Sequence, residues 1–503
     1  MRLRELCSCL KEYDSFNLVE QEVTGITYDS RKVKAGCVFV AIQGHTLNGH
    51  NFIADAVRRG AVALVVEKRI DVPLSLPYIV VSNSRRALAF MSSHFYGDPS
   101  SHMTIIGITG TNGKTTTSYF TKSIIEASGS LAGLIGTIQY QIGENIIPAK
   151  ETTPASVDIH AYLCEMLKAK IKYAVIEASS HALSQHRLDG VRFRSAIFTN
   201  LSAEHLDYHE NIKNYRAEKL NLFKELRKDS FSILNIDHNT SKHFAACTKS
   251  QVVWYGIKRK NADVAAEVMQ MNANGSRFKI NSPWGKAIID TRLAGKHNIY
   301  NALASAANGL ALGFTMETVK RGLESLNGVP GRLEKIDCGQ DFSVYIDFAH
   351  THQALQVILS TLRDVTAGRI ILVFGCGGDR DRKKRPKMGH IAEKYADIFW
   401  ITNDNPRSEE PQSIISEILK GVNKEALFYV QPDRKLAIEE ALSEAKRGDV
   451  VIIAGKGHEQ YQIFRDTTVP FSDHGVVRQA LSRRKVYEQE NYTVDVLKCD
   501  SRL

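Results

Sequence analysis

The chain is 503 residues long, with 43% hydrophobic and 24% charged residues and a formal net charge of +10. This composition is ordinary for a folded globular protein, and the length exceeds one compact core, so we expect roughly three domains. The positive excess is small for this length. A net charge of this size is better suited to attracting phosphorylated small molecules than to binding along DNA.

The eight cysteines lack the paired spacing of a zinc site or of a secreted disulfide framework. Residues 1–6 are charged, and no stretch approaches the ~18 apolar residues of a membrane span. We therefore expect a cytoplasmic protein with reduced thiols and no membrane span.

Apolar runs at 38–42, 61–66 and 78–81 predict the strands of a small N-terminal α/β domain. Through the rest of the chain, apolar runs alternate with helical stretches, as in doubly wound parallel sheets. The three expected domains are residues 1–98, 99–330 and 331–503.

A glycine-rich segment, residues 109–116, follows the strand-like run 103–108. In such a loop the backbone N–H groups face phosphates, Lys114 adds a positive charge, and the Thr115 hydroxyl can complete a Mg²⁺ shell. The standard spacing would place a glycine at Ile108, so the match is irregular, and an ordinary strand-to-helix turn is the alternative. The residues expected to bind ATP here are Gly110, Thr111, Asn112, Gly113, Lys114, Thr115 and Thr116.

Two further strands of the second domain end at polar residues. The run 173–176 ends at Glu177, and the run 196–199 is soon followed by His205. Because parallel sheets bind ligands at the carboxyl ends of their strands, we expect Glu177, His205 and the glycine-rich loop to share one crevice.

Four strands of the third domain also end at polar clusters. The run 344–346 ends at Asp347, and three later strands lead into segments 375–380, 403–407 and 455–459. These segments carry groups able to bind phosphate, carboxylate or amine. Polar turns are the alternative for each one, but four at one sheet edge favour a binding site.

Further motifs occur in order along all three domains. They are Asp29-Ser30-Arg31, Gly44-His45, Glu151-Thr152-Thr153-Pro154, Glu177-Ala178-Ser179-Ser180-His181-Ala182-Leu183, Gln185-His186-Arg187, His205-Leu206-Asp207-Tyr208-His209, Lys219, Gly295-Lys296-His297-Asn298, Asn301, Gly331-Arg332-Leu333-Glu334 and Asp347-Phe348-Ala349-His350. With the glycine-rich loop, these motifs resemble the Mur ligase family over nearly the whole chain.

The resemblance implies a small N-terminal α/β domain for a UDP-linked substrate, a central P-loop NTPase-like parallel-sheet domain for ATP, and a C-terminal Rossmann-like α/β domain for an amino acid. It also implies ATP-driven amide formation in cytoplasmic peptidoglycan precursor synthesis. A carboxylate attacks the γ-phosphate, and an amine then displaces phosphate from the acyl phosphate. Because both reactants of the first step are anionic, the site must supply cations and exclude water.

The family's catalytic and metal-binding residues carry over as implications of the resemblance. Without it, Lys219 would be interpreted as an exposed helical lysine; with it, Lys219 is expected to be carbamylated by CO₂ to N6-carboxylysine. An oxygen-rich shell with one imidazole suits Mg²⁺. The implied metal ligands are Thr115, Glu177, His205 and carbamylated Lys219. The implied catalytic residues are Lys114, Lys219, His205 and Asp347.

The resemblance also implies three groups of substrate contacts. For ATP these are Asn298, Asn301 and Arg332, beyond the glycine-rich loop, whereas His297 is equally well explained as a core histidine. For the UDP-sugar-peptide they are Ser30, His45, Thr152, Thr153, Ser179, Gln185 and Arg187. For the amino acid they are Arg380, Asp404, Asn405, Pro406, Arg407, Gly455 and Glu459.

The segment Asp404-Asn405-Pro406-Arg407 resembles the branch of the family that adds meso-diaminopimelate to a UDP-N-acetylmuramoyl-L-alanyl-D-glutamate acceptor. The distal end of diaminopimelate carries a carboxylate that Arg407 and Arg380 can bind, and an ammonium that Asp404 and Glu459 can accept. Lysine lacks that carboxylate and would leave guanidinium groups unpaired.

Two segments depart from the family pattern: Glu151 stands where asparagine is usual, and residues 351–353 read Thr-His-Gln instead of Thr-Pro-Asp. The alternatives within the class are a lysine-adding or dipeptide-adding ligase and a folyl-polyglutamate synthetase. Outside it, a P-loop switch or nucleic-acid motor could use the basic run 380–387. We expect a monomer that acts on small molecules and binds no nucleic acid.

Overall fold

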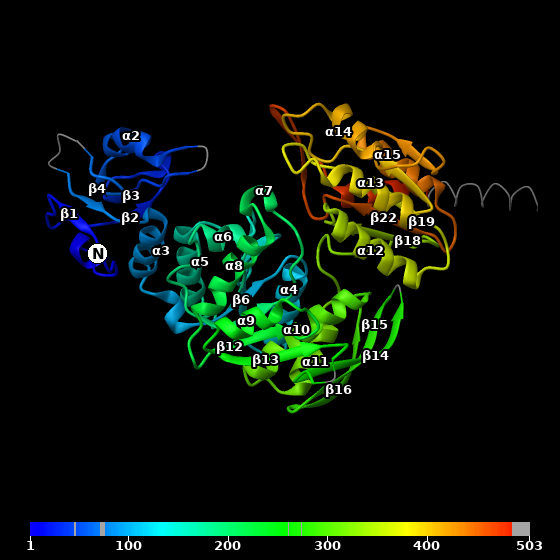
Figure 1. The fold of residues 1–503 in the computed structure, drawn as a ribbon, viewed down its shortest axis with the longest axis horizontal. Coiled ribbons are helices and arrows are strands. Elements are labelled where there is room, and N and C mark those ends of the chain that lie inside the picture. The colour runs from blue at the N-terminus through cyan, green and yellow to red at the C-terminus, as the bar shows by residue number, and fades with distance from the viewer. Residues whose placement is uncertain (45–46, 71–75, 260, 273, 485–503) are drawn as a thin grey trace, which may run out of the picture. The chain divides into compact units, whose positions relative to one another are not determined.

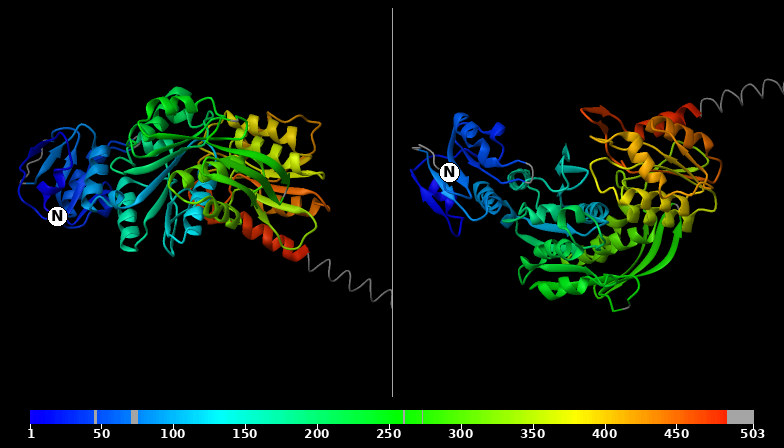
Figure 2. Two further views of the ribbon diagram at one scale, coloured as in Figure 1. Left: turned by 90° about the horizontal axis from the view of Figure 1, so that it is seen from below. Right: turned by 45° about the horizontal axis from the view of Figure 1, so that its top comes forward.

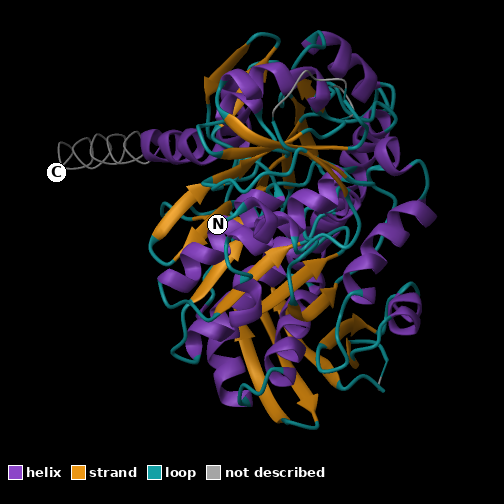
Figure 3. Cartoon of the chain, turned by 90° about the vertical axis from the view of Figure 1, so that its left-hand side faces the viewer, coloured by secondary structure: helices purple, strands orange, loops and turns teal. Residues whose placement is uncertain are grey.

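The computed structural model describes residues 1–44, 47–70, 76–259, 261–272 and 274–484. Strands of the described residues form sheets of five, eleven, six and two strands. Each of the three larger sheets takes its strands from one stretch of chain, as the colour along the ribbon shows (Figures 1 and 2). Helices accompany the strands in all three parts of the chain (Figure 3), so the predicted α/β fold class is confirmed.

The N-terminal sheet has the order β1-β5-β4-β3-β2, parallel except for β1. Val38 and Val40 pack with one group of core residues, whereas Phe39 and Leu64 pack with another, as the alternation of side chains along a strand requires. Its elements are α1 (Leu3–Cys7), β1 (Asp14–Phe16), β2 (Gly25–Thr27), β3 (Cys37–Val40), α2 (Ile53–Arg58), β4 (Ala61–Val66), β5 (Tyr78–Val80) and α3 (Ser84–Phe95).

The central sheet has β6 (Thr104–Thr109) in its interior, between β10 (Tyr173–Glu177) and β11 (Phe193–Phe198). All three run parallel, so their carboxyl ends meet at one edge of the sheet. The order is β16-β15-β14-β13-β12-β11-β6-β10-β7-β8-β9. The other strands are β7 (Ala132–Ile135), β8 (Gln139–Ile142), β9 (Asn145–Pro148), β12 (Phe231–Asn235), β13 (Gln251–Gly256), β14 (Val264–Asn272), β15 (Gly275–Ser282) and β16 (Gly285–Thr291).

The helices of this region include α4, which begins directly after the glycine-rich loop (Figure 1). Buried aliphatic residues of β6, β10 and α5 form one core with Phe223 and Phe244 from α8 and α9. The helices are α4 (Lys114–Ala127), α5 (Ser156–Lys168), α6 (Ser180–Ser184), α7 (Leu206–His209), α8 (Ile212–Lys224), α9 (Ser241–Cys247), α10 (Lys296–Ala311) and α11 (Met316–Ser325).

The C-terminal sheet has the order β17-β18-β22-β19-β20-β21, parallel except for β17. Leu372 of β19 packs in a core with α12, α13 and α14, whereas Ile371 packs in a core with α15. Helices therefore cover both faces of this sheet. The elements of this sheet and its helices are β17 (Glu334–Ile336), β18 (Ser343–Asp347), α12 (His352–Val365), β19 (Ile370–Phe374), α13 (Lys384–Tyr395), β20 (Ile398–Ile401), α14 (Pro411–Leu419), β21 (Phe428–Val430), α15 (Arg434–Glu444) and β22 (Val450–Ala454). The two-stranded antiparallel sheet follows and consists of β23 (Tyr461–Phe464) and β24 (Thr467–Pro470).

Contacts along the chain define two compact units. The first comprises Met1–Ala265, Asn281–Ala287 and Tyr300–Gly322, and the second comprises Ala266–Ile280, Ile288–Ile299 and Leu323–Leu503. The boundaries at residues 98 and 330 stay predictions. Within the described ranges, no helix is long and apolar enough to cross a membrane.

Candidate functional site

The glycine-rich loop joins β6 to α4, and two of its glycines have backbone angles that other residues rarely adopt: φ is +150° at Gly110 and +88° at Gly113. A Cβ on Gly110 would lie 1.9 Å from Oγ1 of Thr199. Ile108, by contrast, is a fully buried strand residue that pairs with Glu177 and Ile197. The irregular glycine spacing therefore arises because position 108 belongs to the strand and not to the turn.

The loop is bound to the chain segment that follows β11. The amide of Asn112 donates to Oδ1 of Asn200 over 3.0 Å, and the amide of Thr111 donates to the Asn200 carbonyl over 2.9 Å. Nζ of Lys114 donates to the carbonyl oxygens of Gly110 and Thr111, at 2.9 and 2.8 Å. The lysine therefore lies against the loop itself, from where its flexible side chain can reach a phosphate.

A buried carboxylate lies next to the first turn of α4. Oε2 of Glu177 accepts hydrogen bonds from the hydroxyls of Thr115 (3.0 Å) and Thr137 (2.9 Å), and Oε1 accepts one from the Thr137 amide (3.1 Å). The described residues contain no group of three or more His, Cys, Asp or Glu side chains arranged to hold a metal. The Thr115 hydroxyl and the Glu177 carboxylate are nevertheless the hard oxygen donors that Mg²⁺ prefers, so this donor pair fits the expected ion.

Lys219, on α8, is 1% exposed, and its Nζ donates to the Gly110 carbonyl oxygen over 3.0 Å. Lys114 donates to the same oxygen. Nζ of Lys219 also lies 4.5 Å from the ring centroid of Tyr215. Burial, and then the charge of Lys114, hold the pKa of Lys219 well below its usual value. The structure therefore places a buried amine at the phosphate loop, where the local sequence alone indicated an exposed lysine.

His205 precedes α7 and has a φ of +56°. Although its ring reaches solvent, partial burial and then the positive charges of His181 and Lys114 lower its pKa to about 3. Its imidazole is therefore neutral at pH 7 and has a lone pair for a metal ion. The rings of His181 and His205 are 4.8 Å apart, between centroids, in an edge-to-face arrangement.

Sequence reasoning quoted His209 only as part of a motif and gave no role to His209 or Tyr215, which pack beside these residues. Nε2 of His209 lies 3.0 Å from the hydroxyl of Ser180, and its ring centroid is 5.2 Å from that of Tyr215. The Tyr215 hydroxyl lies 3.2 Å from Oγ1 of Thr111 in the phosphate loop. The spacing of His205 and His209, four residues apart, was the available signal, because such residues share one face of a helical turn.

The residues expected to contact the UDP-sugar-peptide fall into one connected group, apart from Ser30 and His45. Oγ1 of Thr153 donates to the Glu177 carbonyl (2.5 Å) and lies 3.2 Å from Oγ of Ser179. Arg187 donates to Gln185 (2.8 and 3.1 Å) and to the Thr153 carbonyl (2.7 Å).

The unusual residue Glu151 forms an ion pair with Arg187, and the hydroxyl of the adjacent Thr152 lies 3.2 Å from that of Thr137. Glu151 thus occupies one side of the Arg187 guanidinium in this structure. Ser30 is buried in the turn Ser30–Lys32 of the N-terminal domain. His45 lies outside the described residues.

The expected adenosine contacts lie in different compact units. Asn301 lies at the phosphate loop, because its Oδ1 is 3.4 Å from the Thr117 hydroxyl and would be 2.3 Å from a Cβ on Gly113. Asn298 belongs to the second unit and donates to the Ala294 carbonyl over 2.8 Å. Burial lowers the pKa of His297 to about 4, and Nδ1 of this ring lies 3.4 Å from the Thr361 hydroxyl, which favours its interpretation as a core histidine.

Asp347 and Arg332 lie together in the second unit, at the end of β18. The Asp347 carboxylate accepts hydrogen bonds from the backbone amides of Leu333 (2.6 Å) and Ala349 (2.7 Å). Burial raises the pKa of Asp347, and the nearby charge of Arg332 opposes that change. The guanidinium carbon of Arg332 lies 4.9 Å from the ring centroid of Phe348.

The seven residues expected to bind the amino acid lie on the loops that follow β19, β20 and β22. Arg407 has a φ of +55°, and its guanidinium donates to the Gly378 carbonyl over 2.7 Å. Burial and the charge of Arg380 lower the pKa of Arg407, whereas Asp404 and Glu459 oppose that change. A Cβ on Gly377 would lie 2.9 Å from Nη1 of Arg407 and 3.9 Å from Cγ of Arg380, so both arginines lie against this loop.

Backbone contacts complete this cluster. A Cβ on Gly455 would lie 2.7 Å from Oδ2 of Asp404, and a Cβ on Gly378 would lie 1.8 Å from the Pro406 carbonyl oxygen. Nδ2 of Asn405 donates to Oε2 of Glu459 over 2.9 Å. The loops are therefore closely packed against one another.

Sequence reasoning missed Lys456, which is fully buried within the same cluster. Its Nζ donates to Oδ1 of Asn405 (3.0 Å) and to Oε2 of Glu459 (2.8 Å). Its position between two glycines was a usable signal, because glycines allow a backbone to approach its neighbours closely.

Two arginines of the basic run 380–387 form ion pairs within the protein. Arg385 is fully buried and paired with Glu409 and Glu417, and Arg382 is also paired with Glu417. These two side chains therefore serve the packing of this region.

A phosphate loop with a buried carboxylate and a buried lysine, together with a polar cluster on a Rossmann-like sheet, defines an ATP-dependent ligase of the three-domain α/β type. Three family models match the chain: "Mur ligase family, catalytic domain" at residues 22–96, "Mur ligase middle domain" at residues 108–309, and "Mur ligase, glutamate ligase domain" at residues 331–457. The chain belongs to the Mur ligase family.

Similar proteins extend over almost the full chain. A protein of Geobacillus kaustophilus named UDP-N-acetylmuramoyl-L-alanyl-D-glutamate--2,6-diaminopimelate ligase is 41% identical over 491 residues, which cover 96% of this chain and all of the relative. A protein of Clostridium tetani with the same name is also 41% identical to this chain. The alignment covers 96% of this chain and 99% of that relative.

Solved structures agree with the fold. One solved structure is of a protein named UDP-N-acetylmuramoyl-L-alanyl-D-glutamate--2,6-diaminopimelate ligase. It superposes on this chain with a TM-score of 0.70 at 29% sequence identity, and the superposition covers 96% of this chain and 100% of that protein chain. MurF from Acinetobacter baumannii, at 20% identity and a TM-score of 0.65, covers 90% of this chain and 95% of its own and supports the fold alone.

Proposed function

We propose that this protein joins meso-2,6-diaminopimelate to the D-glutamate carboxylate of UDP-N-acetylmuramoyl-L-alanyl-D-glutamate, with conversion of ATP to ADP and phosphate. The observation that carries the proposal is the cluster around Arg407. A Cβ on Gly377 would lie 2.9 Å from Nη1 of Arg407 and 3.9 Å from Cγ of Arg380, and a Cβ on Gly455 would lie 2.7 Å from Oδ2 of Asp404. The proposal is supported by the names of the full-length relatives.

The chemistry proceeds in two displacements. A carboxylate oxygen of the acceptor attacks the γ-phosphorus and ADP leaves, which produces an acyl phosphate. The neutral amine of diaminopimelate then attacks the acyl carbon and phosphate leaves, with loss of the amine proton. Lys114 and the first backbone amides of α4 bind the ATP phosphates in this proposal, because α4 begins at Lys114 and the N-terminus of a helix favours negative charge.

The metal and the modified lysine belong to the same proposal. Mg²⁺ bound by Thr115, Glu177 and His205 would supply positive charge between the two anionic reactants. Lys219 reacts through its neutral amine with CO₂, loses a proton and becomes a carbamate, a further oxygen ligand. Support comes from its burial beside Lys114, because a neutral amine is the nucleophilic form.

The remaining assignments rest on the resemblance to the Mur ligase family. Ser30, His45, Thr152, Thr153, Ser179, Gln185 and Arg187 are proposed to bind the UDP-sugar-peptide. Asn298, Asn301 and Arg332 are proposed to bind adenosine, and Asp347 is proposed as the catalytic residue of the third domain. We also propose domains at residues 1–98, 99–330 and 331–503, a cytoplasmic location and a monomeric state.

The proposed amino-acid specificity rests on charge. Arg407 and Arg380 would bind the distal carboxylate of diaminopimelate, while Asp404 and Glu459 would accept its distal ammonium. L-Lysine offers the ammonium alone, so it would leave the half-buried Arg407 without its anionic partner.

Phosphate release is the test of the reaction. We expect release that requires ATP, Mg²⁺, the UDP-muramyl dipeptide and meso-diaminopimelate together. A matched reaction with L-lysine measures specificity. Phosphate release without the UDP-linked substrate would contradict the proposed reaction, and equal turnover with lysine would contradict the specificity alone.

A further inference from the structure

Arg434 and Asp473 form a completely buried ion pair in the second compact unit. Both side chains are 0% exposed, and two parallel hydrogen bonds of 2.8 Å connect Nε and Nη2 of Arg434 to the two carboxylate oxygens. The third guanidinium nitrogen, Nη1, is buried and has no acceptor among the described residues. A buried ion pair is often no more stabilising than apolar side chains of the same size, so its presence suggests a role other than stability.

The pair contacts the backbone that leads into the proposed amino-acid site. Nη2 of Arg434 donates to the carbonyl oxygen of Ala454 over 3.1 Å. Ala454 is the last residue of β22 and directly precedes Gly455, whose φ is +117°. Arg434 begins α15, and Asp473 follows the β23–β24 hairpin. One guanidinium therefore holds the start of the loop that carries Lys456 and Glu459.

The charge of Arg434 also reaches the carboxylates of that site. Burial alone would lower the pKa of Arg434, but the negative charges of Asp473, and then of Asp404 and Glu459, raise it. The geometry agrees, because a Cβ on Gly455, the residue after Ala454, would lie 2.7 Å from Oδ2 of Asp404. Two carboxylates in one partly buried site repel each other, and a nearby cation reduces that repulsion.

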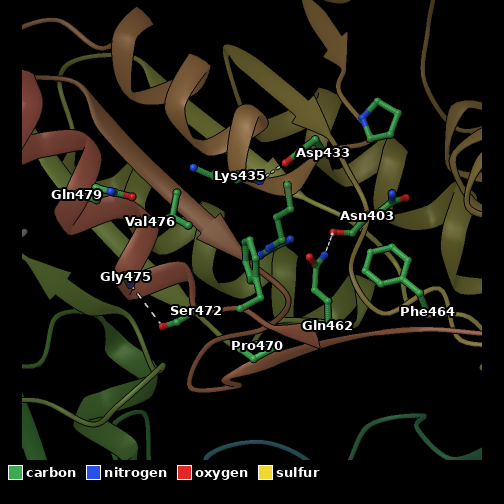
Figure 4. A pocket seen from close by; sticks show the side chains of 13 residues that line it. Asn403, Asp433, Lys435, Gln462, Phe464, Pro470, Ser472, Gly475, Val476 and Gln479 are labelled. Carbon is green, nitrogen blue, oxygen red and sulfur yellow. Dashed lines mark hydrogen bonds between the residues drawn. The ribbon is translucent and has the colours of Figure 1, made fainter. Parts of the chain in front are cut away.

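A cavity of about 900 Å³ has Arg434 in its lining. Asn403 and Gln462 also line it (Figure 4). Nε2 of Gln462 donates to the Asp404 carbonyl over 3.0 Å, so the wall of the cavity is continuous with the amino-acid cluster.

We propose that Arg434 is a positioning residue for the amino-acid substrate. It fixes the turn from Ala454 to Gly455 and supplies the buried positive charge that lets Asp404 and Glu459 face the substrate ammonium together. Asp473 holds the guanidinium in the orientation that both tasks need. This inference rests on the proposed function, because it assumes that these two carboxylates accept the ammonium of the amino acid.

The test compares three variants in the phosphate-release assay with the full-length protein: Arg434→Met, Arg434→Lys and the double variant Arg434→Met with Asp473→Leu. The single Met variant leaves Asp473 buried without a partner, so its thermal unfolding midpoint is expected to fall. The double variant removes the charges as a unit and is expected to unfold near the wild-type midpoint.

In the double variant we expect KM for diaminopimelate to rise about tenfold or more, while KM for ATP and for the UDP-muramyl dipeptide changes less than about twofold. Arg434→Lys keeps the charge and is expected to recover part of the loss. A double variant with wild-type KM for diaminopimelate would overturn the inference, as would an equal rise of all three KM values. If the proposed function itself is wrong, phosphate release by the wild-type protein will not depend on diaminopimelate, which distinguishes that failure from failure of this inference.

Discussion

Replacing Glu177 by glutamine tests whether the buried carboxylate beside the phosphate loop serves chemistry or only structure. Oε1 accepts the Thr137 amide, so the glutamine oxygen is expected to occupy that position and its NH₂ group the position of Oε2. The hydroxyls of Thr115 and Thr137, which donate to Oε2, can rotate and accept instead. The variant therefore keeps its hydrogen bonds but loses the negative charge.

The expected cost in stability is moderate. Three charge-assisted hydrogen bonds become neutral ones, a loss of about 1 kcal/mol each, or ~3 kcal/mol in all. For a domain of this size the thermal midpoint should fall by about 6–12 °C. Activity should fall much further, by about 100-fold or more in kcat/KM, because a proposed Mg²⁺ ligand has lost its charge.

The assay is phosphate release titrated with Mg²⁺, accompanied by thermal unfolding. Thr137→Val is the matched control, because it removes one hydrogen bond to the Glu177 carboxylate and leaves the negative charge of that carboxylate in place. The metal assignment is refuted if Glu177→Gln keeps the wild-type Mg²⁺ dependence and turnover while folded.

Three further predictions concern buried charged and titratable groups. Lys219→Ala should lose most activity and regain part of it with added short-chain carboxylic acids; full activity without them would contradict the carbamate. Burial, followed by the charges of His181 and Lys219, lowers the pKa of His209 to about 4, below the unfolded value of ~6.5. The folded state therefore binds fewer protons, so stability is complete above pH ~6.5 and declines as the pH falls towards 4, which thermal unfolding of wild type and His209→Gln will check. Arg385→Met should cost about 3–5 kcal/mol in chemical denaturation because Glu409 and Glu417 lose a buried partner, whereas Arg382→Met, at a 59% exposed side chain, should cost at most about 1 kcal/mol.

The sequence predicted the strands and their polar carboxyl ends well, because the relevant signals are local. The glycine-rich loop follows an apolar run and precedes a helix, and both elements occur in the structure. The positions of Glu177 and Asp347 at strand ends also follow from short apolar runs. A local sequence pattern is sufficient to predict a buried strand and the polar residue at its carboxyl end.

The environments of individual charges could not be predicted in the same way. The burial of Lys219 depends on the phosphate loop, 109 residues earlier in the chain, since its partner is Gly110. The ion pair of Arg434 with Asp473 connects residues 39 apart, on two different elements. Without an indication of which elements pack together, each of these residues resembles an ordinary surface charge.

The most direct test of the central claim is initial phosphate release by wild-type protein at saturating ATP, Mg²⁺ and UDP-muramyl dipeptide, with meso-diaminopimelate or L-lysine as the amine. We expect kcat/KM for diaminopimelate to exceed that for lysine by at least about 100-fold, the scale set by leaving a charged donor unpaired. Equal values for the two amino acids would contradict the assignment of Arg407 and its neighbours as the diaminopimelate site.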